Sequence, residues 1–277
     1  MSYLSQFNYK LTGPDTETPW VFLHGLFGYL NNWGSIVRAI DKNSKCLVYD
    51  QRGHGQSFKP KTGYKTEDYA ADLKKIIDEL NFKKIILVGH SMGGRNALLF
   101  ANQFPERIEK LIIEDIGPES DPNNYLYYER MLASIPTPFA SKNQAQQFFD
   151  ERFSLVFKTK EDPKVLSAFL MVNLKEDESG LYDWRFSASA MVESVREGRA
   201  VDSWNLVKKL QVPTLWIRGE KSVELSRENF EKILSLNSLI QGVTIPDAGH
   251  WVHSENKEEF LKAIKQFTGF DNSSKAQ

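Results

Sequence analysis

Short runs of apolar residues recur along the chain and predict the strands of a buried sheet. Each run is too short for a helix and carries Val, Ile or Leu on both faces, as parallel strands covered on both sides do. The predicted strands are residues 20–24, 46–50, 85–89, 111–115, 214–218 and 242–245. Residues 3–11 are expected to add an antiparallel edge strand in front of them.

Amphipathic stretches with helical spacing separate these runs. The predicted helices are residues 33–40, 66–80, 92–103, 226–234 and 257–267. Alternation of buried strands with such helices is typical of a mostly parallel central sheet that has helices on both faces. The fold class is therefore predicted to be α/β.

The alternation stops after Gly117-Pro118 and resumes near residue 212. Residues 118–200 have a helical pattern and many aromatic side chains, most of which we expect to form a core of their own. We interpret 118–200 as a helical cap insertion over the strand ends, and 1–117 with 201–270 as the core domain. The polar tail, residues 271–277, is expected to be disordered.

Composition and charge exclude several kinds of partner. The 277 residues include 35 basic and 36 acidic side chains, so nothing favours nucleic acid or an anionic membrane as a partner. The single cysteine, Cys46, lies in a strand-like run and is expected to be a core residue. No apolar run is long enough to span a membrane, and the first residues lack a secretory signal pattern, so we expect a cytoplasmic protein. The sequence predicts no oligomeric state.

A candidate nucleophile follows the predicted strand at 85–89. Residues 89–93 read Gly-His-Ser-Met-Gly and lead into a predicted helix. A serine on such a sharp turn has an exposed hydroxyl, and the residues two before and two after it must be very small. The context of strand and helix identifies Ser91 as the candidate nucleophile, and the Met92 amide at the start of the helix as an oxyanion donor.

A second donor is expected from the loop after the first strong strand. Residues 24–28 read His-Gly-Leu-Phe-Gly, and the two glycines allow the backbone to turn an amide inward. The Leu26 or the Phe27 amide is the candidate. We expect His24 to be a buried structural histidine and not a base.

The candidate base is His250. In a chain order of serine, acid and histidine, the base comes late, and His250 follows the last predicted strand. His253 lies three residues further on, in the expected first turn of the next helix. A surface or capping role suits His253 better.

These motifs together resemble the α/β-hydrolase superfamily over nearly the full chain. They are residues 24–28, Asp-Gln-Arg-Gly-His-Gly-Gln-Ser at 50–57, Gly-His-Ser-Met-Gly-Gly at 89–94 and Gly-His at 249–250. In detail they are similar to the small YbfF-type esterases and their mitochondrial abhydrolase relatives, which share the Gly-His-Trp-Val-His ending found here at 249–253. The resemblance implies an α/β-hydrolase fold, hydrolysis of short acyl esters or thioesters without cofactor or metal, and a structural role for residues 50–57.

The acid is the point at which the sequence departs from the superfamily. Many members carry it after the strand predicted here at 214–218, where this chain has no aspartate but has Glu220 and Glu224. Asp115 ends the strand after the nucleophile, and in the YbfF-like esterases the acid follows that earlier strand. A carboxylate at the mouth of a buried strand also needs a partner such as a histidine N–H. We therefore favour Asp115, with Glu224 and Glu220 as alternatives, and expect its neighbour Glu114 to face the other side of the strand.

The resulting hypothesis is a serine esterase acting on a small-molecule ester or thioester through an acyl-enzyme. One alternative is a cofactor-free lyase or synthase similar to the menaquinone-pathway synthase, which shares the Ser-Met-Gly-Gly-Arg run found at 91–95. A second alternative, an epoxide hydrolase or haloalkane dehalogenase, needs a carboxylate nucleophile at position 91, so the serine found there argues against it. A third alternative is a non-catalytic ligand-binding relative.

Overall fold

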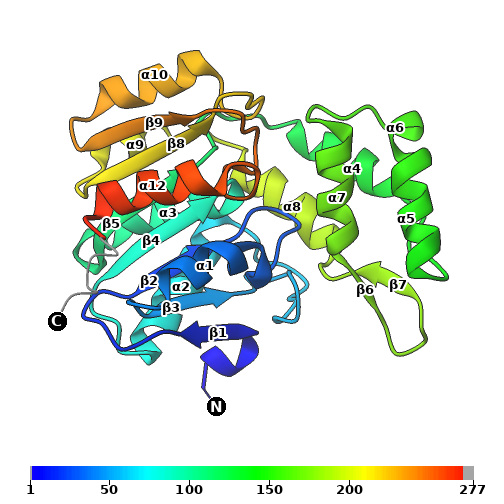
Figure 1. The fold of residues 1–277 in the computed structure, drawn as a ribbon, viewed down its shortest axis with the longest axis horizontal. Coiled ribbons are helices and arrows are strands. Elements are labelled where there is room, and N and C mark those ends of the chain that lie inside the picture. The colour runs from blue at the N-terminus through cyan, green and yellow to red at the C-terminus, as the bar shows by residue number, and fades with distance from the viewer. Residues whose placement is uncertain (1, 271–277) are drawn as a thin grey trace.

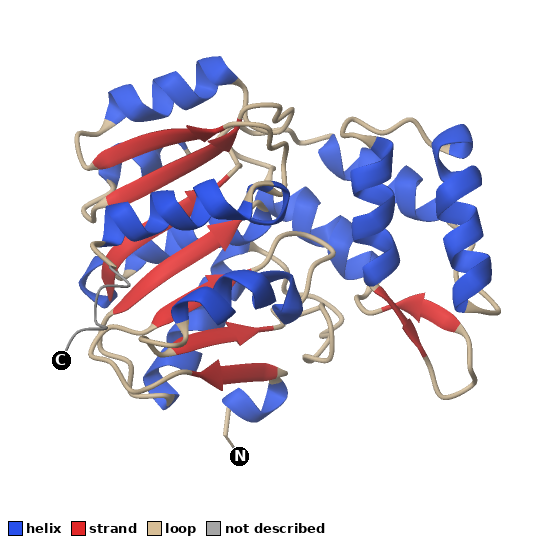
Figure 2. Cartoon of the chain, in the orientation of Figure 1, coloured by secondary structure: helices blue, strands red, loops and turns tan. Residues whose placement is uncertain are grey.

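A seven-stranded sheet forms the centre of the protein in a computed structural model that describes residues 2–270 (Figures 1 and 2). Its strand order is β1-β3-β2-β4-β5-β8-β9, with β1 antiparallel to β3 and every other pair parallel. The strands are β1 (Tyr9–Thr12), β2 (Trp20–Leu23), β3 (Cys46–Tyr49), β4 (Ile85–His90), β5 (Ile108–Glu114), β8 (Thr214–Gly219) and β9 (Ile240–Ile245). The predicted α/β class is confirmed.

All six predicted parallel strands are present, and the edge strand is shorter than expected. Residues 3–11 begin with a turn of 3₁₀ helix at Leu4–Gln6, and pairing with β3 starts only at Tyr9. Leu4 is buried among the apolar side chains beneath the sheet, so this segment folds inward before it can extend. Cys46 is buried in β3, as predicted.

Helices cover both faces of the sheet. α2 (Thr66–Glu79), α3 (Met92–Gln103), α9 (Trp204–Lys209) and α10 (Arg227–Leu236) pack on one face. α1 (Gly34–Ile40) and α12 (Lys257–Thr268) pack on the other, and the one-turn helix α11 (Val252–Glu255) precedes α12. In Figure 1, α1 and α12 lie in front of the sheet. The layers bury both faces of the strands, which is why their sequences are apolar throughout.

Residues 118–200 leave the sheet after β5 and lie beyond the carboxyl ends of the strands (Figure 1). They form α4 (Asn124–Ala133), α5 (Lys142–Glu151), α6 (Phe153–Val156), α7 (Pro163–Val172), β6 (Leu174–Glu176), β7 (Tyr182–Trp184) and α8 (Ala188–Gly198). The hairpin of β6 and β7 was not predicted. Its turn is fixed locally, because the Asp177 carboxylate accepts the N–H groups of Ser179 and Leu181.

The two ends of this segment run side by side. The Ser203 N–H donates to Pro118 O at 2.6 Å, and the Asp121 N–H donates to Arg199 O at 3.0 Å. Arg95 of α3 donates to carbonyls near both ends, to Glu119 O at 2.7 Å and to Gly198 O at 3.3 Å. One side chain of the core thus joins both ends of the segment to the helix that follows Ser91.

No helix within residues 2–270 is both long and apolar enough to cross a membrane. Residues 271–277, for which disorder was expected, lie outside the described part of the chain.

Candidate active site

Parallel strands direct the candidate residues to one edge of the sheet. Ser91 follows β4, Asp115 follows β5, and His250 lies on the loop after β9. The loop after β2 carries Leu26 and Phe27 to the same edge. Ligand sites of open parallel sheets form at the carboxyl ends of the strands, so this is the expected place for a site.

Ser91 occupies a strained turn between β4 and α3. Its φ of 53° and ψ of −119° lie where L residues are rarely found. The turn is also tightly packed: a Cβ atom at Gly89 would lie 2.4 Å from Gly93 O, and one at Gly93 would lie 2.5 Å from Leu23 O. Glycine at both positions is therefore required, as the sequence pattern predicted.

The loop of residues 24–28 packs directly against this turn. A Cβ atom at Gly25 would lie 2.7 Å from His90 Nδ1 and 3.2 Å from Ser91 Cβ. Phe27 has a φ of 63°, and neither its N–H nor that of Leu26 donates to a protein atom within residues 2–270. Leu26 lines a cavity together with Ser91 and Met92, whose own N–H begins α3 and has no partner within the helix.

His24 is buried beside this loop, as expected for a structural histidine. Its Nε2 accepts the Gln51 N–H at 3.0 Å, and its main-chain carbonyl accepts the Gln51 side chain at 2.7 Å. Asp50 accepts the Leu30 N–H at 2.7 Å from the other side. Residues 50–57 therefore support the loop from below and do not enter the cavity that Ser91 lines.

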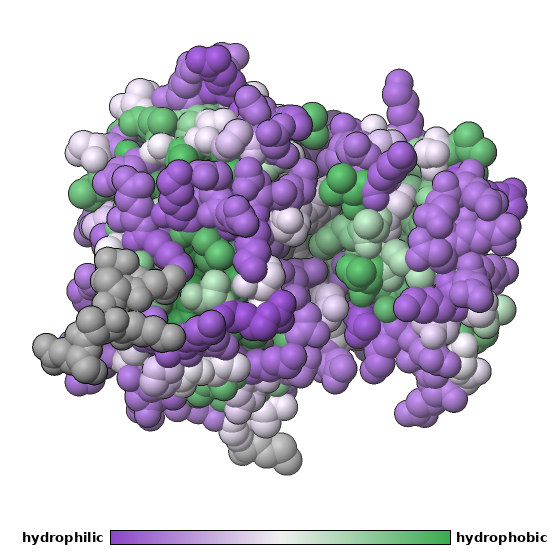
Figure 3. Space-filling model, viewed as in Figure 1, coloured by the Kyte–Doolittle hydropathy of each residue, from purple (hydrophilic) through white to green (hydrophobic). Residues whose placement is uncertain are grey.

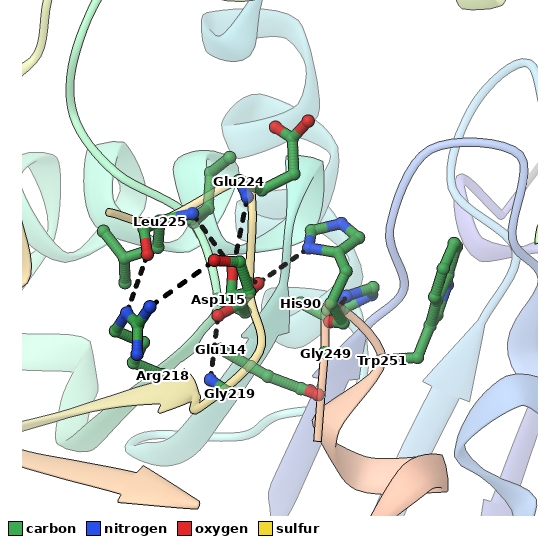
Figure 4. A network of polar contacts seen from close by, with 12 residues as sticks. His90, Glu114, Asp115, Arg218, Gly219, Glu224, Leu225, Gly249 and Trp251 are labelled. Atoms are coloured by element: carbon green, nitrogen blue, oxygen red, sulfur yellow. Dashed lines mark hydrogen bonds and ion pairs between the residues drawn. The ribbon is translucent and has the colours of Figure 1, made fainter. Parts of the chain in front are cut away.

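Asp115 is fully buried and has three hydrogen-bond partners (Figure 4). Its Oδ2 lies 2.9 Å from His250 Nδ1 and accepts the Ser222 hydroxyl at 2.6 Å. Its Oδ1 accepts the Gly219 N–H at 3.0 Å. Because the carboxylate only accepts, the pairing places the His250 proton on Nδ1 and leaves Nε2 free to take another.

His250 is held from both sides by main-chain contacts. His90 Nε2 donates to His250 O at 2.9 Å, and the two rings lie 4.7 Å apart. Glu255 accepts the N–H groups of Gly249 at 3.0 Å and Trp251 at 3.0 Å. Since His90 is the neighbour of Ser91 in the chain, these contacts bring His250 beside the turn that carries Ser91.

Burial and the Asp115 contact shift the pKa values of the pair. Burial raises the pKa of Asp115 against the opposing effect of its hydrogen bonds. Burial alone would lower the pKa of His250, but the hydrogen bond and the charge of Asp115, followed by the charges of Glu224 and Glu161, raise it to about 9. The site thus favours the imidazolium form, which a base must reach during acyl transfer.

Neither alternative acid contacts His250. Glu224 is buried and forms an ion pair with Arg199 at 2.6 Å, and the Arg199 charge lowers the pKa of Glu224 despite its burial. Glu220 is exposed, and its carboxylate accepts the Asp247 N–H at 3.1 Å. Of the three candidates, Asp115 is the carboxylate that the fold brings to the histidine.

The surface or capping role expected for His253 is wrong. His253 lies in the first turn of α11, but it is 2% exposed and its Nδ1 lies 2.8 Å from Glu114 Oε1. The Glu114 side chain thus has a different histidine partner from Asp115, which contacts His250. The partner of a buried carboxylate cannot be read from local spacing when it lies 139 residues away.

Sequence reasoning also missed three residues around the pair. Gly219, the last residue of β8, and Ser222, in the loop after it, hold Asp115. Glu161 of the 118–200 segment lines a cavity of about 240 Å³ beside His250. Ser222 had no motif signal, because only carboxylates were considered in that loop. Glu161 lies in a loop for which the sequence offers no pattern.

The cavity lined by Ser91 is small, with a volume of about 30 Å³. Its walls come from the core and from α4 and α8, and include Ile116, Tyr128 and Val195. Such a volume holds little more than one water molecule. Within residues 2–270 no cluster of His, Cys, Asp and Glu side chains could hold a metal ion.

The family model described as the alpha/beta hydrolase fold matches residues 18–257. The chain belongs to this family. It is 31% identical over 267 residues to the mouse sn-1-specific diacylglycerol lipase ABHD11. The match covers 94% of this chain and 84% of that protein. The chain is 26% identical to the Escherichia coli esterase YbfF, in a match that covers 91% of this chain and 93% of that one.

A solved structure of E-2-(acetamidomethylene)succinate hydrolase has the same architecture, with a TM-score of 0.82 and 25% identity. The match covers 95% of each chain. The predicted resemblance to YbfF-type esterases and their abhydrolase relatives is therefore confirmed. The esterase and lipase names of these relatives support a hydrolase.

Proposed function

We propose that this protein is a serine esterase in which Ser91, His250 and Asp115 form the catalytic triad. The observation that carries the proposal is the 2.9 Å contact between His250 Nδ1 and a fully buried Asp115, beside a serine on a strained turn. A nucleophile, a base and an orienting acid are the three parts that acyl transfer requires.

The mechanism follows from these contacts. Ser91 Oγ attacks the ester carbonyl while His250 Nε2 takes its proton, and Asp115 stabilises the imidazolium. The N–H groups of Met92 and Leu26 donate to the oxyanion, and we favour Leu26 over Phe27 because Leu26 lines the cavity with Ser91. Collapse of the intermediate transfers the proton from His250 to the departing alcohol. Water then attacks the acyl-enzyme with His250 as base.

The narrow cavity favours substrates with short acyl groups. A volume of about 30 Å³ is smaller than any acyl group, so the walls must move to admit one, and they must move further for a longer chain. Those walls belong partly to residues 118–200. We therefore propose that this segment acts as a cap that limits acyl length. The mouse relative is named for a diacylglycerol lipase, whose acyl chain would need a larger space than this one. We include thioesters with short acyl groups in the proposed substrate class.

The synthase-like alternative differs from the esterase in the position of the catalytic carboxylate. It would place the working carboxylate after β8, where Glu224 is engaged by Arg199. The third alternative, a non-catalytic relative, differs in whether Ser91 reacts at all. A fluorophosphonate probe tests this directly, because it labels a serine only where a base activates it.

The decisive experiment measures hydrolysis of p-nitrophenyl esters from acetate to octanoate. Ser91→Ala and Asp115→Asn should each lose turnover by at least about 10³-fold, while Glu224→Gln should retain most of it. Ser120→Ala, at an exposed serine of the same chain, serves as the matched control. Turnover should fall as the acyl chain lengthens beyond butyrate.

Two results would overturn the proposal. Wild-type protein that hydrolyses none of the esters and resists the fluorophosphonate would support a binding role. Activity that survives in Asp115→Asn but disappears in Glu224→Gln would move the acid to the later strand.

A further inference from the structure

A second buried carboxylate–imidazole pair lies directly beside Asp115 and His250. Glu114, the last residue of β5, is 0% exposed, and both of its carboxylate oxygens lie within 2.9 Å of His253 Nδ1. The ring of Trp33 stacks on His253 at 4.3 Å and completes its burial. The acyl-transfer steps described above do not use this pair.

Glu114 connects the two segments that carry the nucleophile and the base. Its main-chain carbonyl accepts the Ser91 N–H at 2.9 Å. Its side chain accepts the main-chain N–H of His253 at 2.8 Å, in addition to the imidazole. One residue therefore fixes both the turn that presents Ser91 and the chain three residues beyond His250.

The helix that follows His250 needs such a contact. α11 spans only Val252–Glu255, and a single turn of helix is not stable without tertiary partners. Its first N–H groups have no partner within the helix, and a carboxylate at this end satisfies one of them and interacts well with the helix dipole. Glu114 supplies this carboxylate from the sheet, and Glu255 holds Gly249 and Trp251 on the other side of the base.

We propose that Glu114 and His253 are positioning residues for His250. This inference rests on the proposed esterase function. Asp115 orients the imidazole of His250 through a hydrogen bond to Nδ1. Glu114, in contrast, fixes the position of the backbone that carries His250 relative to Ser91. Two consecutive carboxylates at the end of β5 thus have different roles. Asp115 acts on the side chain of His250, and Glu114 acts on the backbone that carries it.

The test compares Glu114→Gln and His253→Gln with wild type in a pre-steady-state assay on p-nitrophenyl acetate. The burst amplitude counts active sites, and the burst rate measures acylation at each site. We expect acylation per site to fall by about 10- to 100-fold in both variants with KM nearly unchanged, since small displacements of a catalytic group have effects of this size. Glutamine at position 114 keeps an oxygen that can accept the His253 N–H, so it should retain more activity than Glu114→Ala.

The outcomes separate this inference from the proposed function. Wild-type protein that shows neither a burst nor steady-state hydrolysis of the ester would refute the esterase itself. A normal wild-type burst, with variants whose amplitude falls but whose rate per site stays within twofold, would show that Glu114 only supports folding and would overturn the positioning role. Should Glu114→Gln yield no folded protein, His253→Gln, which leaves β5 intact, is assessed by the same criterion.

Discussion

The hydroxyl of Ser222 offers the sharpest test of how the acid is held. It donates to Asp115 Oδ2 at 2.6 Å, the oxygen that also contacts His250. The same hydroxyl oxygen accepts the N–H groups of Glu224 at 3.2 Å and Leu225 at 3.1 Å. Ser222→Ala removes all three contacts and leaves Asp115 with Gly219 and His250.

The magnitude follows from these contacts. A hydrogen bond to a charged group contributes about 1.5–3 kcal/mol, and each neutral one about 0.5–1.5 kcal/mol. Since such contributions are not additive, we expect Ser222→Ala to lower the free energy of unfolding by about 2–4 kcal/mol. If about 1.4 kcal/mol of this is lost from the transition state, kcat falls about tenfold while KM stays nearly constant.

The assay combines urea unfolding with ester turnover corrected for active sites. Ser167→Ala is the matched control, because Ser167 is also buried but donates only to a neutral carbonyl, Phe149 O, at 3.3 Å. In an Asp115→Asn background, Ser222→Ala should have little further effect on kcat, since the two residues act through one contact. A kcat within twofold of wild type for Ser222→Ala alone would refute the reasoning.

Three further predictions concern the same edge of the sheet. The pKa of about 9 for His250 lies above its ordinary value of 6.5, so kcat/KM should fall about tenfold per pH unit below pH 9. The stabilisation from its pairing with Asp115 is fully present below pH 6.5 and is lost as pH rises through 9. The free energy of unfolding in urea should therefore be higher at pH 6 than at pH 9.5, whereas kcat/KM should be lower at pH 6. A kcat/KM midpoint at or below pH 6.5 would contradict both expectations. Gly25→Ala should lower kcat by about 10²-fold in ester assays without unfolding the protein, because its Cβ would lie 2.7 Å from His90 Nδ1, at the end of a side chain; unchanged activity would show that the loop tolerates the shift. Glu220→Gln should leave turnover within twofold of wild type, since Glu220 is exposed and does not contact His250; a large loss would restore it as a candidate acid.

Much of the fold was predictable because the sheet is buried on both faces. Each strand is then a continuous apolar run whose length marks the strand itself. The bounds of the predicted parallel strands differ from the observed ones by at most three residues at either end. The edge strand and the β6–β7 hairpin lack this signal, since both are short and exposed on at least one side. Their positions depend on contacts that no local pattern describes.

The candidate site divides in the same way. Ser91 and the glycines around it are required by the local backbone, so a short motif is enough to find them. Ser222 and Asp115 are 107 residues apart, and only the fold brings the hydroxyl to the carboxylate. His253 was misjudged for the same reason, because its buried partner lies on a distant strand.

The adjoining ends of residues 118–200 have a consequence for how this protein can change. The segment leaves and rejoins the core at neighbouring points, tied by Pro118 to Ser203 and by Asp121 to Arg199. Figure 3 shows apolar surface over α7. Val165 and Phe169 of α7 line a groove together with Trp251 of the core. A segment attached in this way is exchangeable. A different insertion between the same two points would leave the strands and helices of the core unchanged. Substrate range could therefore diverge among descendants of one ancestral scaffold, or in a laboratory chimera, while the chemistry beneath is inherited intact.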